Sequence, residues 1–104
     1  MRPLLLLGGV LLIGLKAADA IGHYVPAKGF VPDEQPAIRI AEAVWIPIYG
    51  EEMIKEERPA KATLADDVWT VRGSWNKGPN MSGGVAEAKI SKPDGRIIMV
   101  THGK

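Results

Sequence analysis

The 104-residue sequence contains no cysteine, only two histidines and only 6% aromatic residues. The absence of cysteine excludes disulfides, thiolate metal ligands, a cysteine nucleophile and a lipid anchor attached through cysteine. The histidines, His23 and His102, stand at opposite ends of the sequence, and no serine lies in a GxSxG context. The sequence therefore predicts neither a nucleophilic triad nor a metal centre, and no cofactor is expected.

An excess of charge of one sign is also missing. The chain has 13 basic and 12 acidic residues, and removal of residues 1–20, with Arg2, Lys16 and Asp19, leaves equal numbers of each. A nucleic-acid-binding protein would show a clustered basic surplus, so no nucleic acid is expected as a partner. The neighbouring carboxylates at 51–52, 56–57 and 66–67 are typical of solvated surface and turns rather than of catalysis. An enzyme is the weaker class.

The first twenty residues resemble an export signal. A positive start at Arg2 precedes an apolar run at 4–15, LLLLGGVLLIGL, and Ala18-Asp19-Ala20 has the small-x-small pattern read by signal peptidase. The run is shorter than the roughly 20 residues of a membrane-spanning helix. We therefore expect cleavage after Ala20, a periplasmic or otherwise exported protein and no stable membrane anchor. The alternative is an inner-membrane protein held by an uncleaved signal.

The remaining chain divides into an extended segment, 21–31, and a single domain, 32–104. The extended segment contains Gly22, Pro26 and Gly29 and has no regular apolar period. We expect its apolar residues to attach it to the core (Tyr24, Phe30 and Val31), and His23 to be solvated. Because no disulfide supports so small a domain, its stability must come from packing or from a partner.

The domain is predicted to begin with a helix between Pro32 and Gly50. Asp33 is placed to cap the helix by accepting from the first-turn N–H groups, and Gly50 suits its end. The interior Pro47 predicts a kink or an irregular last turn, and a short second helix is expected from Glu51 to Ile54. Apolar residues recur with helical spacing and predict the buried face: Ala37, Ile40, Ala41, Val44 and Ile48.

Four short segments after the helix read as strands, at 60–64, 68–74, 85–90 and 96–102. In the second, Trp69 and Val71 share the apolar side and should face the helix. Turn signals separate the strands at 65–67 and at 92–95, where the sequence is KPDG. The predicted fold is α+β, with one main helix packed on an antiparallel sheet of three to four strands.

The segment 75–84, WNKGPNMSGG, is the longest cluster of turn-forming residues in this domain. Binding residues concentrate in such loops, and tryptophan is enriched in interface hot spots. We therefore take four residues as candidate partner contacts: Trp75, Lys77, Asn80 and Met81. The alternative for Trp75, beside a predicted strand, is that its ring belongs to the core.

Three parts of the sequence together resemble a known family: PDEQPAIRIAEAVWIPIYGEE, DDVWTVRGS and GGVAEAKISKPDGRIIMVTHGK. They resemble the small bacterial immunity proteins with a nuclear-transport-factor-2-like fold, and the resemblance covers about residues 31–104. It implies a minimal cystatin-like or nuclear-transport-factor-2-like fold. It also implies a protein that neutralises a cognate toxin of a polymorphic-toxin or contact-dependent system by direct, non-catalytic binding. It assigns no contact residues.

Two further classes fit the sequence without the resemblance. One is a small exported binding or peptidase-modulating module of the cell envelope, because a helix on a hairpin sheet is also found in regulators of secreted peptidases. The other is a structural subunit of an envelope complex. A direct assay of peptidase inhibition discriminates the first of these from an immunity protein, and a search for stable envelope partners discriminates the second.

Overall fold

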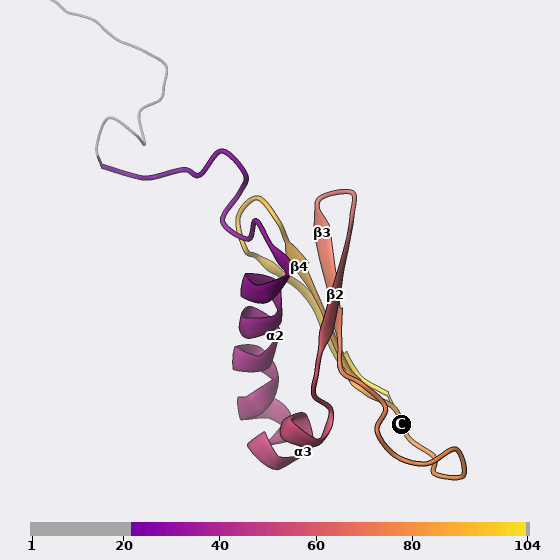
Figure 1. Cartoon of the computed structure of the whole chain (residues 1–104). Helices are drawn as coiled ribbons and strands as arrows, with labels where there is room; N and C mark the ends of the chain where they lie inside the picture. Colours follow the sequence, from indigo (N-terminus) through magenta and orange to yellow (C-terminus); the bar gives the residue numbers. More distant parts are fainter. Residues whose placement is uncertain (1–21, 104) are drawn as a thin grey trace, which may run out of the picture.

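The computed structural model describes residues 22–103 and shows a helical layer against one sheet (Figure 1). The elements run in the order α2 (Glu34–Tyr49), α3 (Glu51–Glu56), β2 (Lys61–Ala65), β3 (Val68–Arg72), β4 (Ala86–Ser91) and β5 (Ile97–His102). Residues 1–20, where an export signal is predicted, lie outside the described part of the chain. Between residues 22 and 103 no helix is long and apolar enough to cross a membrane.

The four strands form one antiparallel sheet in the order β2-β3-β4-β5. The helix α2 lies across one face and packs against β2, β3 and β4. Trp69 and Val71 are buried on that face, as the alternation predicted. The α+β fold is thus confirmed, and each predicted strand has a counterpart whose bounds differ by at most two residues at either end.

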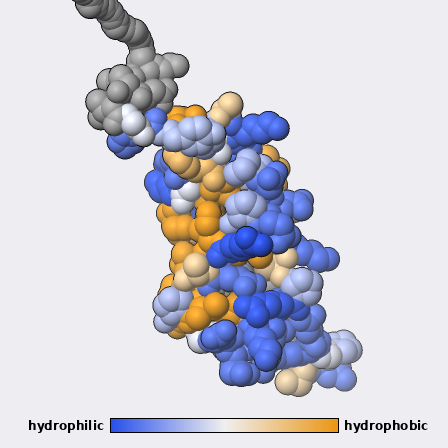
Figure 2. Space-filling view, turned by 60° about the vertical axis from the view of Figure 1, so that its left-hand side comes forward, coloured by the Kyte–Doolittle hydropathy of each residue, from blue (hydrophilic) through white to orange (hydrophobic). Residues whose placement is uncertain are grey.

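The predicted buried face of α2 is confirmed at Ala37 and Ala41, with Ile40 partly buried against the core, and is wrong at Ile48. Ala37, Ala41 and Trp45 are buried, whereas Ile48 is 58% exposed. Two alanines at four-residue spacing let the helix approach the sheet closely, and the large ring of Trp45 then fills the space farther along. The buried residues of α2 are four positions apart, and this spacing brings Trp45 rather than Ile48 toward the sheet. On the face shown in Figure 2, hydrophobic residues form a strip beside a hydrophilic area.

The two ends of α2 also differ from expectation. Asp33 occupies the N-cap position, but its side chain makes no capping hydrogen bond, so the predicted carboxylate cap is wrong. Pro47 stands inside the helix, which continues through it to Tyr49. Gly50 ends the helix as predicted, with a positive φ of 95° and its N–H donating to the Ile46 carbonyl over 2.8 Å. The short second helix is confirmed as α3.

The segment before α2 is attached to the core through Val31. The Trp69 indole N–H donates to the Val31 carbonyl over 2.7 Å, and the Val31 side chain is buried. The backbone N–H of Phe30 bonds the Pro93 carbonyl in the β4–β5 turn. Tyr24 and Phe30 nevertheless expose most of their side chains, so the expectation that both attach the segment to the core is wrong. His23 is exposed, as predicted.

The two predicted turns join the strands as expected. Asp66 and Asp67 both adopt positive φ, 52° and 60°, in the tight connection from β2 to β3. Aspartate tolerates this conformation better than most residues, and two successive positive φ values suit the twist of a hairpin. The β4–β5 turn closes through Gly95, whose N–H donates to the Ser91 carbonyl over 2.8 Å.

Candidate protein-binding site

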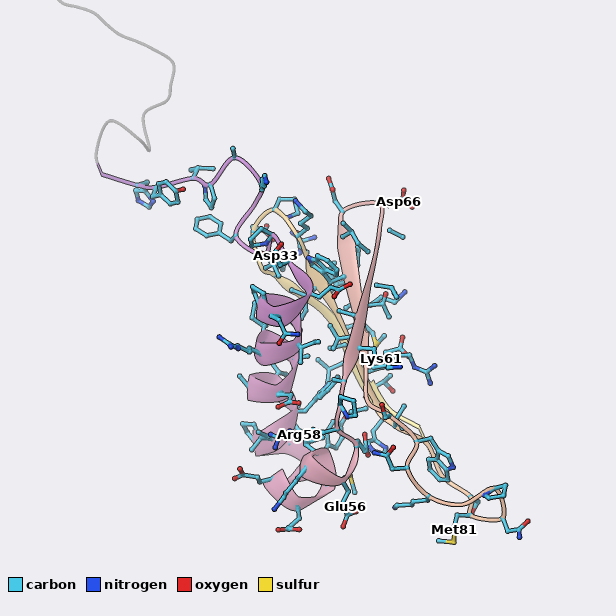
Figure 3. All side chains as sticks on the ribbon, in the orientation of Figure 1. Asp33, Glu56, Arg58, Lys61, Asp66 and Met81 are labelled. Atoms are coloured by element: carbon cyan, nitrogen blue, oxygen red, sulfur yellow. The ribbon has the colours of Figure 1, made fainter. Side chains whose placement is uncertain are left out.

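The segment that follows β3 projects beyond the sheet, at the end of the domain away from residues 22–31 (Figure 1). We call residues 74–84 the projecting loop. Met81 lies near its tip (Figure 3) and is 59% exposed. Trp75 is 38% exposed, so the alternative that its ring belongs to the core is wrong. Lys77 and Asn80 are exposed as well. All four sequence-predicted contact residues are therefore on the surface of one loop.

The structure brings two of those four side chains together. The Lys77 Nζ lies 5.9 Å from the centroid of the Trp75 ring, within the range of a cation–π contact. Asn80 and Met81 belong to a separate turn, in which the Met81 N–H donates to the Gly78 carbonyl over 3.1 Å. The loop thus presents an aromatic ring beside a cation near its base and a flexible apolar side chain near its tip.

The base of the projecting loop is fixed to the connection between α3 and β2. The Asn76 Nδ2 donates to the carbonyls of Glu56 and Arg58, over 3.0 and 2.7 Å. The Ser74 N–H donates to the Glu57 carbonyl over 2.7 Å, and the Ser74 hydroxyl donates to the Pro59 carbonyl. Trp75 lies between these two anchoring residues. Its position is therefore defined more firmly than its place in a glycine-rich loop would suggest.

Glu57 joins the loop base to the sheet. Its side chain is buried, and its Oε1 accepts from the Ala86 N–H at the start of β4 over 2.8 Å. Its Oε2 lies 2.7 Å from the Nε2 of His102 at the end of β5. A Cβ on Gly73 would lie 2.7 Å from the Glu57 Oε1, so a larger residue at this position would displace the Glu57 carboxylate. One carboxylate thus holds the start of β4, the end of β5 and the connection after α3.

Both ring nitrogens of His102 face hydrogen-bond acceptors. The Nδ1 lies 2.7 Å from the Gly103 carbonyl, and the Nε2 faces the Glu57 carboxylate. Only the protonated imidazolium can donate from both nitrogens. Burial alone would lower the pKa of His102 and nearby Lys77 acts the same way, but the hydrogen bonds to Glu57 and Gly103 and the Glu57 charge outweigh them and raise it above its ordinary value. The Tyr49 ring packs beside the imidazole, with centroids 5.1 Å apart.

Sequence reasoning missed this cluster. Glu57 was assigned to a solvated run of charge, and that assignment is wrong because its side chain is buried. Asn76 and His102 carried no contact signal, since they are distant from Glu57 in sequence. The local signal that could have indicated the site is Gly73, a glycine at the end of a strand, which often marks close approach of another group.

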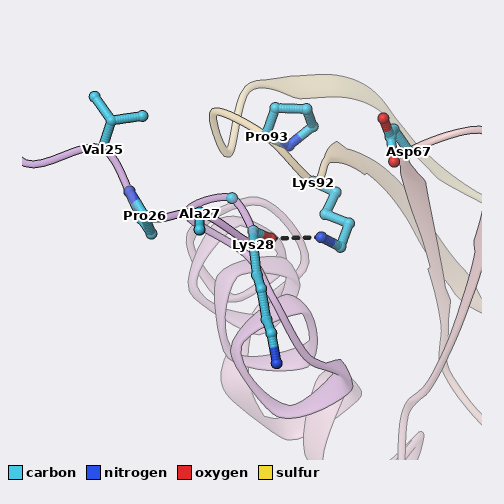
Figure 4. Close-up of a pocket in the computed structure, with 8 residues that line it drawn as sticks. Val25, Pro26, Ala27, Lys28, Asp67, Lys92 and Pro93 are labelled. Atoms are coloured by element: carbon cyan, nitrogen blue, oxygen red, sulfur yellow. Dashed lines mark hydrogen bonds between the residues drawn. The ribbon is translucent and has the colours of Figure 1, made fainter.

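A concave region lies at the end of the domain opposite the projecting loop, between the segment before α2 and the two turns (Figure 4). It has a volume of about 330 Å³ and is lined by Val25, Pro26, Ala27, Lys28, Gly29, Asp67, Lys92 and Pro93. The Lys92 Nζ is already engaged with the Lys28 carbonyl, and the Lys92 N–H donates to the Asp67 carbonyl. These contacts attach the segment to the turns. Within residues 22–103, no three potential metal ligands gather here or elsewhere.

The sequence profile of a known family, NTF2 fold immunity protein, matches residues 36–104, which is most of the described chain. The chain belongs to this immunity protein family. The match includes nearly all of α2, the whole sheet, the projecting loop and the Glu57–His102 pair. The helix on a four-stranded antiparallel sheet is the arrangement expected of it. No solved structure matches the chain.

This immunity protein is also similar to the uncharacterized protein YhhH of Escherichia coli strain K12. The two are 30% identical over 90 residues, which cover 86% of this chain and 69% of YhhH. The similarity therefore extends beyond the region matched by the family profile. This similarity adds no described activity, because YhhH is itself uncharacterized.

Proposed function

We propose that this immunity protein neutralises a cognate bacterial toxin by direct, non-catalytic binding, and that the projecting loop supplies part of the contact surface. Membership in the immunity protein family carries the first statement. The second rests on an exposed Trp75 between two anchored residues, Ser74 and Asn76. A preorganised aromatic residue loses little conformational freedom on binding, and such residues contribute strongly to protein interfaces.

The chemistry of the loop favours a protein surface as its ligand. Trp75 and Met81 offer exposed apolar area, whereas Lys77 is the only charged residue between 74 and 84. Methionine adapts its shape to a partner, and tryptophan provides a rigid anchor. A loop of this composition would bury apolar area against a toxin rather than follow a phosphate backbone, which is consistent with the balanced overall charge.

We further propose that residues 1–20 direct export and that the immunity protein acts in the periplasm. The positive start, the short apolar run and the Ala18-Asp19-Ala20 pattern support this location. Fractionation of cells that produce the full chain, followed by N-terminal sequencing of the mature protein, tests the proposal. A mature N-terminus at Ile21 is expected. A full-length protein in the membrane fraction would instead support the uncleaved signal, and one in the cytosol would contradict both.

Co-expression tests the toxin-binding proposal. The full chain is produced together with each candidate toxin encoded beside its gene, and growth is measured. We expect rescue by the native chain, and about a tenfold or greater loss of affinity when Trp75→Ala and Met81→Ala are combined. Leu64→Ala on β2 is the matched control, because Leu64 is a similarly exposed apolar residue outside the loop. Failure to rescue growth from any neighbouring toxin contradicts the function. If the native chain rescues growth and the double variant binds the toxin as tightly as the native chain does, only the proposed role of the loop is contradicted.

A further inference from the structure

The face of the sheet away from α2 carries a different chemistry from the core face. Side chains alternate along each strand, so the residues between the buried positions point to this side. Figure 3 places Lys61 on the side of the sheet away from α2. Neither helix of the described chain packs on this face. We call it the open face and define it by six residues of β2, β3 and β4: Lys61, Thr63, Thr70, Arg72, Glu87 and Lys89.

Two like charges stand directly opposite each other on this face. Lys61 on β2 pairs in register with Arg72 on β3, and both side chains are exposed. Like charges at directly opposed positions of antiparallel strands are destabilising. The Arg72 Nε has a carboxylate neighbour, the Glu87 Oε1 at 3.3 Å, but Lys61 forms no ion pair with any residue between 22 and 103. The pair is thus unfavourable to folding and leaves one cation free.

A third cation lies on the same face. Lys89 on β4 pairs in register with Thr70, and it too has no ion-pair partner within the described chain. Three cations therefore share the open face with a single carboxylate, Glu87. The balanced charge of the whole chain conceals this local surplus of positive charge. By contrast, the exposed start of α3 is acidic at Glu51 and Glu52.

The open face is hollowed between β2 and β3. The hollow has a volume of about 240 Å³ and is lined by Lys61, Thr63, Thr70, Arg72 and Gly73. Its lining side chains are two cations and two hydroxyl groups, and no carboxylate is among them. All four can donate hydrogen bonds. The hollow is therefore suited to a carboxylate, which accepts several such bonds and favours charged donors.

We propose that the open face docks an acidic segment of a protein partner, with one carboxylate seated in the hollow between Lys61 and Arg72. Charge complementarity selects this occupant. The single acidic residue on the face, Glu87, would repel a continuous phosphate backbone, whereas a protein segment can place its carboxylates beside the cations alone. The inference rests on the proposed function only for the identity of the partner, the toxin. Its test does not require that toxin.

Because Lys61 and Arg72 are opposed like charges, a binding role of Lys61 can be distinguished from a structural one. Replacing Lys61 with threonine removes the like-charge pair and adds a residue that favours strands. We expect Lys61→Thr to unfold at the same temperature as the native protein or higher, while its affinity for an acidic ligand falls about twofold to fivefold, as expected for one exposed cation. If Lys61 only supported the fold, its replacement would lower the unfolding temperature and leave the affinity for the acidic ligand unchanged.

The experiment uses the chain from residue 21 and a short labelled peptide of alternating glutamate and serine. Binding is measured by fluorescence polarisation at low ionic strength, and the contact is mapped by amide chemical shifts. Lys55→Thr in α3 is the matched control, since it removes an exposed cation outside the open face. The glutamine analogue of the peptide controls for charge, and inorganic phosphate serves as a competitor.

Binding of the glutamate peptide with shifts in β2 and β3, weakened by Lys61→Thr and Arg72→Thr but not by Lys55→Thr, supports the proposal. No binding, equal binding of the glutamine peptide, or equal losses in all three variants overturns it. Displacement of the peptide by phosphate at comparable concentration also overturns it, because it indicates a general anion site. None of these outcomes bears on whether the chain rescues cells from a toxin, so the two proposals fail independently.

Discussion

The Glu57 carboxylate and the His102 imidazole are hydrogen-bonded across 45 residues of sequence, with the Oε2 and Nε2 atoms 2.7 Å apart. Both side chains are largely shielded from water, at 11% and 18% exposure. The pair closes the end of the sheet from which the projecting loop departs. Because Glu57 also accepts from the Ala86 N–H, a change in either partner affects the base of the loop and the end of β5 together.

The stability of the protein should fall as the pH rises through the pKa of folded His102. That pKa is raised above the ordinary value of 6.5, so the folded state holds the proton more tightly than the unfolded state does. The His102 contribution is therefore complete below pH 6.5 and is lost above the folded pKa. Urea unfolding between about pH 5.5 and pH 9 should show a decline in the native protein that is absent from His102→Gln.

His23→Gln is the control for that measurement, because His23 is exposed and lies outside the domain core. It should reproduce the native pH dependence. A His102→Gln variant with the same pH dependence as the native protein would show that the raised pKa of His102 does not contribute to stability. An upward trend of stability with pH in the native protein alone would contradict the direction of the shift.

Gly73→Ala should destabilise the fold by about 1–3 kcal/mol, because the added methyl group would overlap the Glu57 carboxylate. The Cβ would lie 2.7 Å from the Oε1 and 3.0 Å from the Glu57 Cβ. Chemical denaturation measures the loss. Gly78→Ala in the projecting loop has open space around its Cβ and should change the unfolding free energy by less than about 0.5 kcal/mol. Equal effects of the two substitutions would contradict the close approach at Gly73.

Ile54→Ala and Ile48→Ala should differ strongly, although both remove the same atoms. Ile54 is only 1% exposed, and its truncation should cost about 2–5 kcal/mol through lost burial and a cavity. Ile48 is mostly exposed, so its truncation should cost less than about 1 kcal/mol. Thermal and urea unfolding of the two variants measures the difference. A large loss at Ile48 would restore the helix face predicted from the sequence.

Pro47→Ala should increase both helicity and stability. Pro47 lies on an exposed part of α2 and cannot donate to the Ala43 carbonyl, so alanine restores one helical hydrogen bond. We expect a gain of about 1–3 kcal/mol in unfolding free energy and a stronger helical circular dichroism signal. Pro36→Ala is the matched control, because a proline in the first turn has no such bond to lose. Unchanged helicity in Pro47→Ala would show that this proline does not perturb the helix.

Local patterns predicted most of the fold. Alternation identified the buried side of β3, and the Lys92–Gly95 sequence identified the β4–β5 turn, because strand faces and turn geometry depend on neighbouring residues. The helix face was predicted less well. Periodicity identifies an apolar stripe, but the sheet decides which part of the stripe is covered. The covered part contains the small side chains of Ala37 and Ala41 and the large ring of Trp45.

The candidate site was only partly predictable. The composition of residues 75–84 identified the projecting loop, and Trp75 and Met81 are exposed as expected. The anchoring of the loop was not predictable, because Glu57 and Asn76 act through partners far away in sequence. The like-charge pair of Lys61 and Arg72 depends on strand register, which a single sequence does not define once both strands have a polar face.

The bond between the Trp69 indole and the Val31 carbonyl limits how far the domain can move from anything held by residues 1–20. Only residues 21–30 separate that region from the first buried residue, and ten extended residues reach about 35 Å. If an uncleaved signal held the chain in the membrane, Val31 would therefore lie within about 35 Å of the bilayer. The projecting loop lies at the far end of the domain from residues 22–31 (Figure 1), so it would remain clear of that attachment.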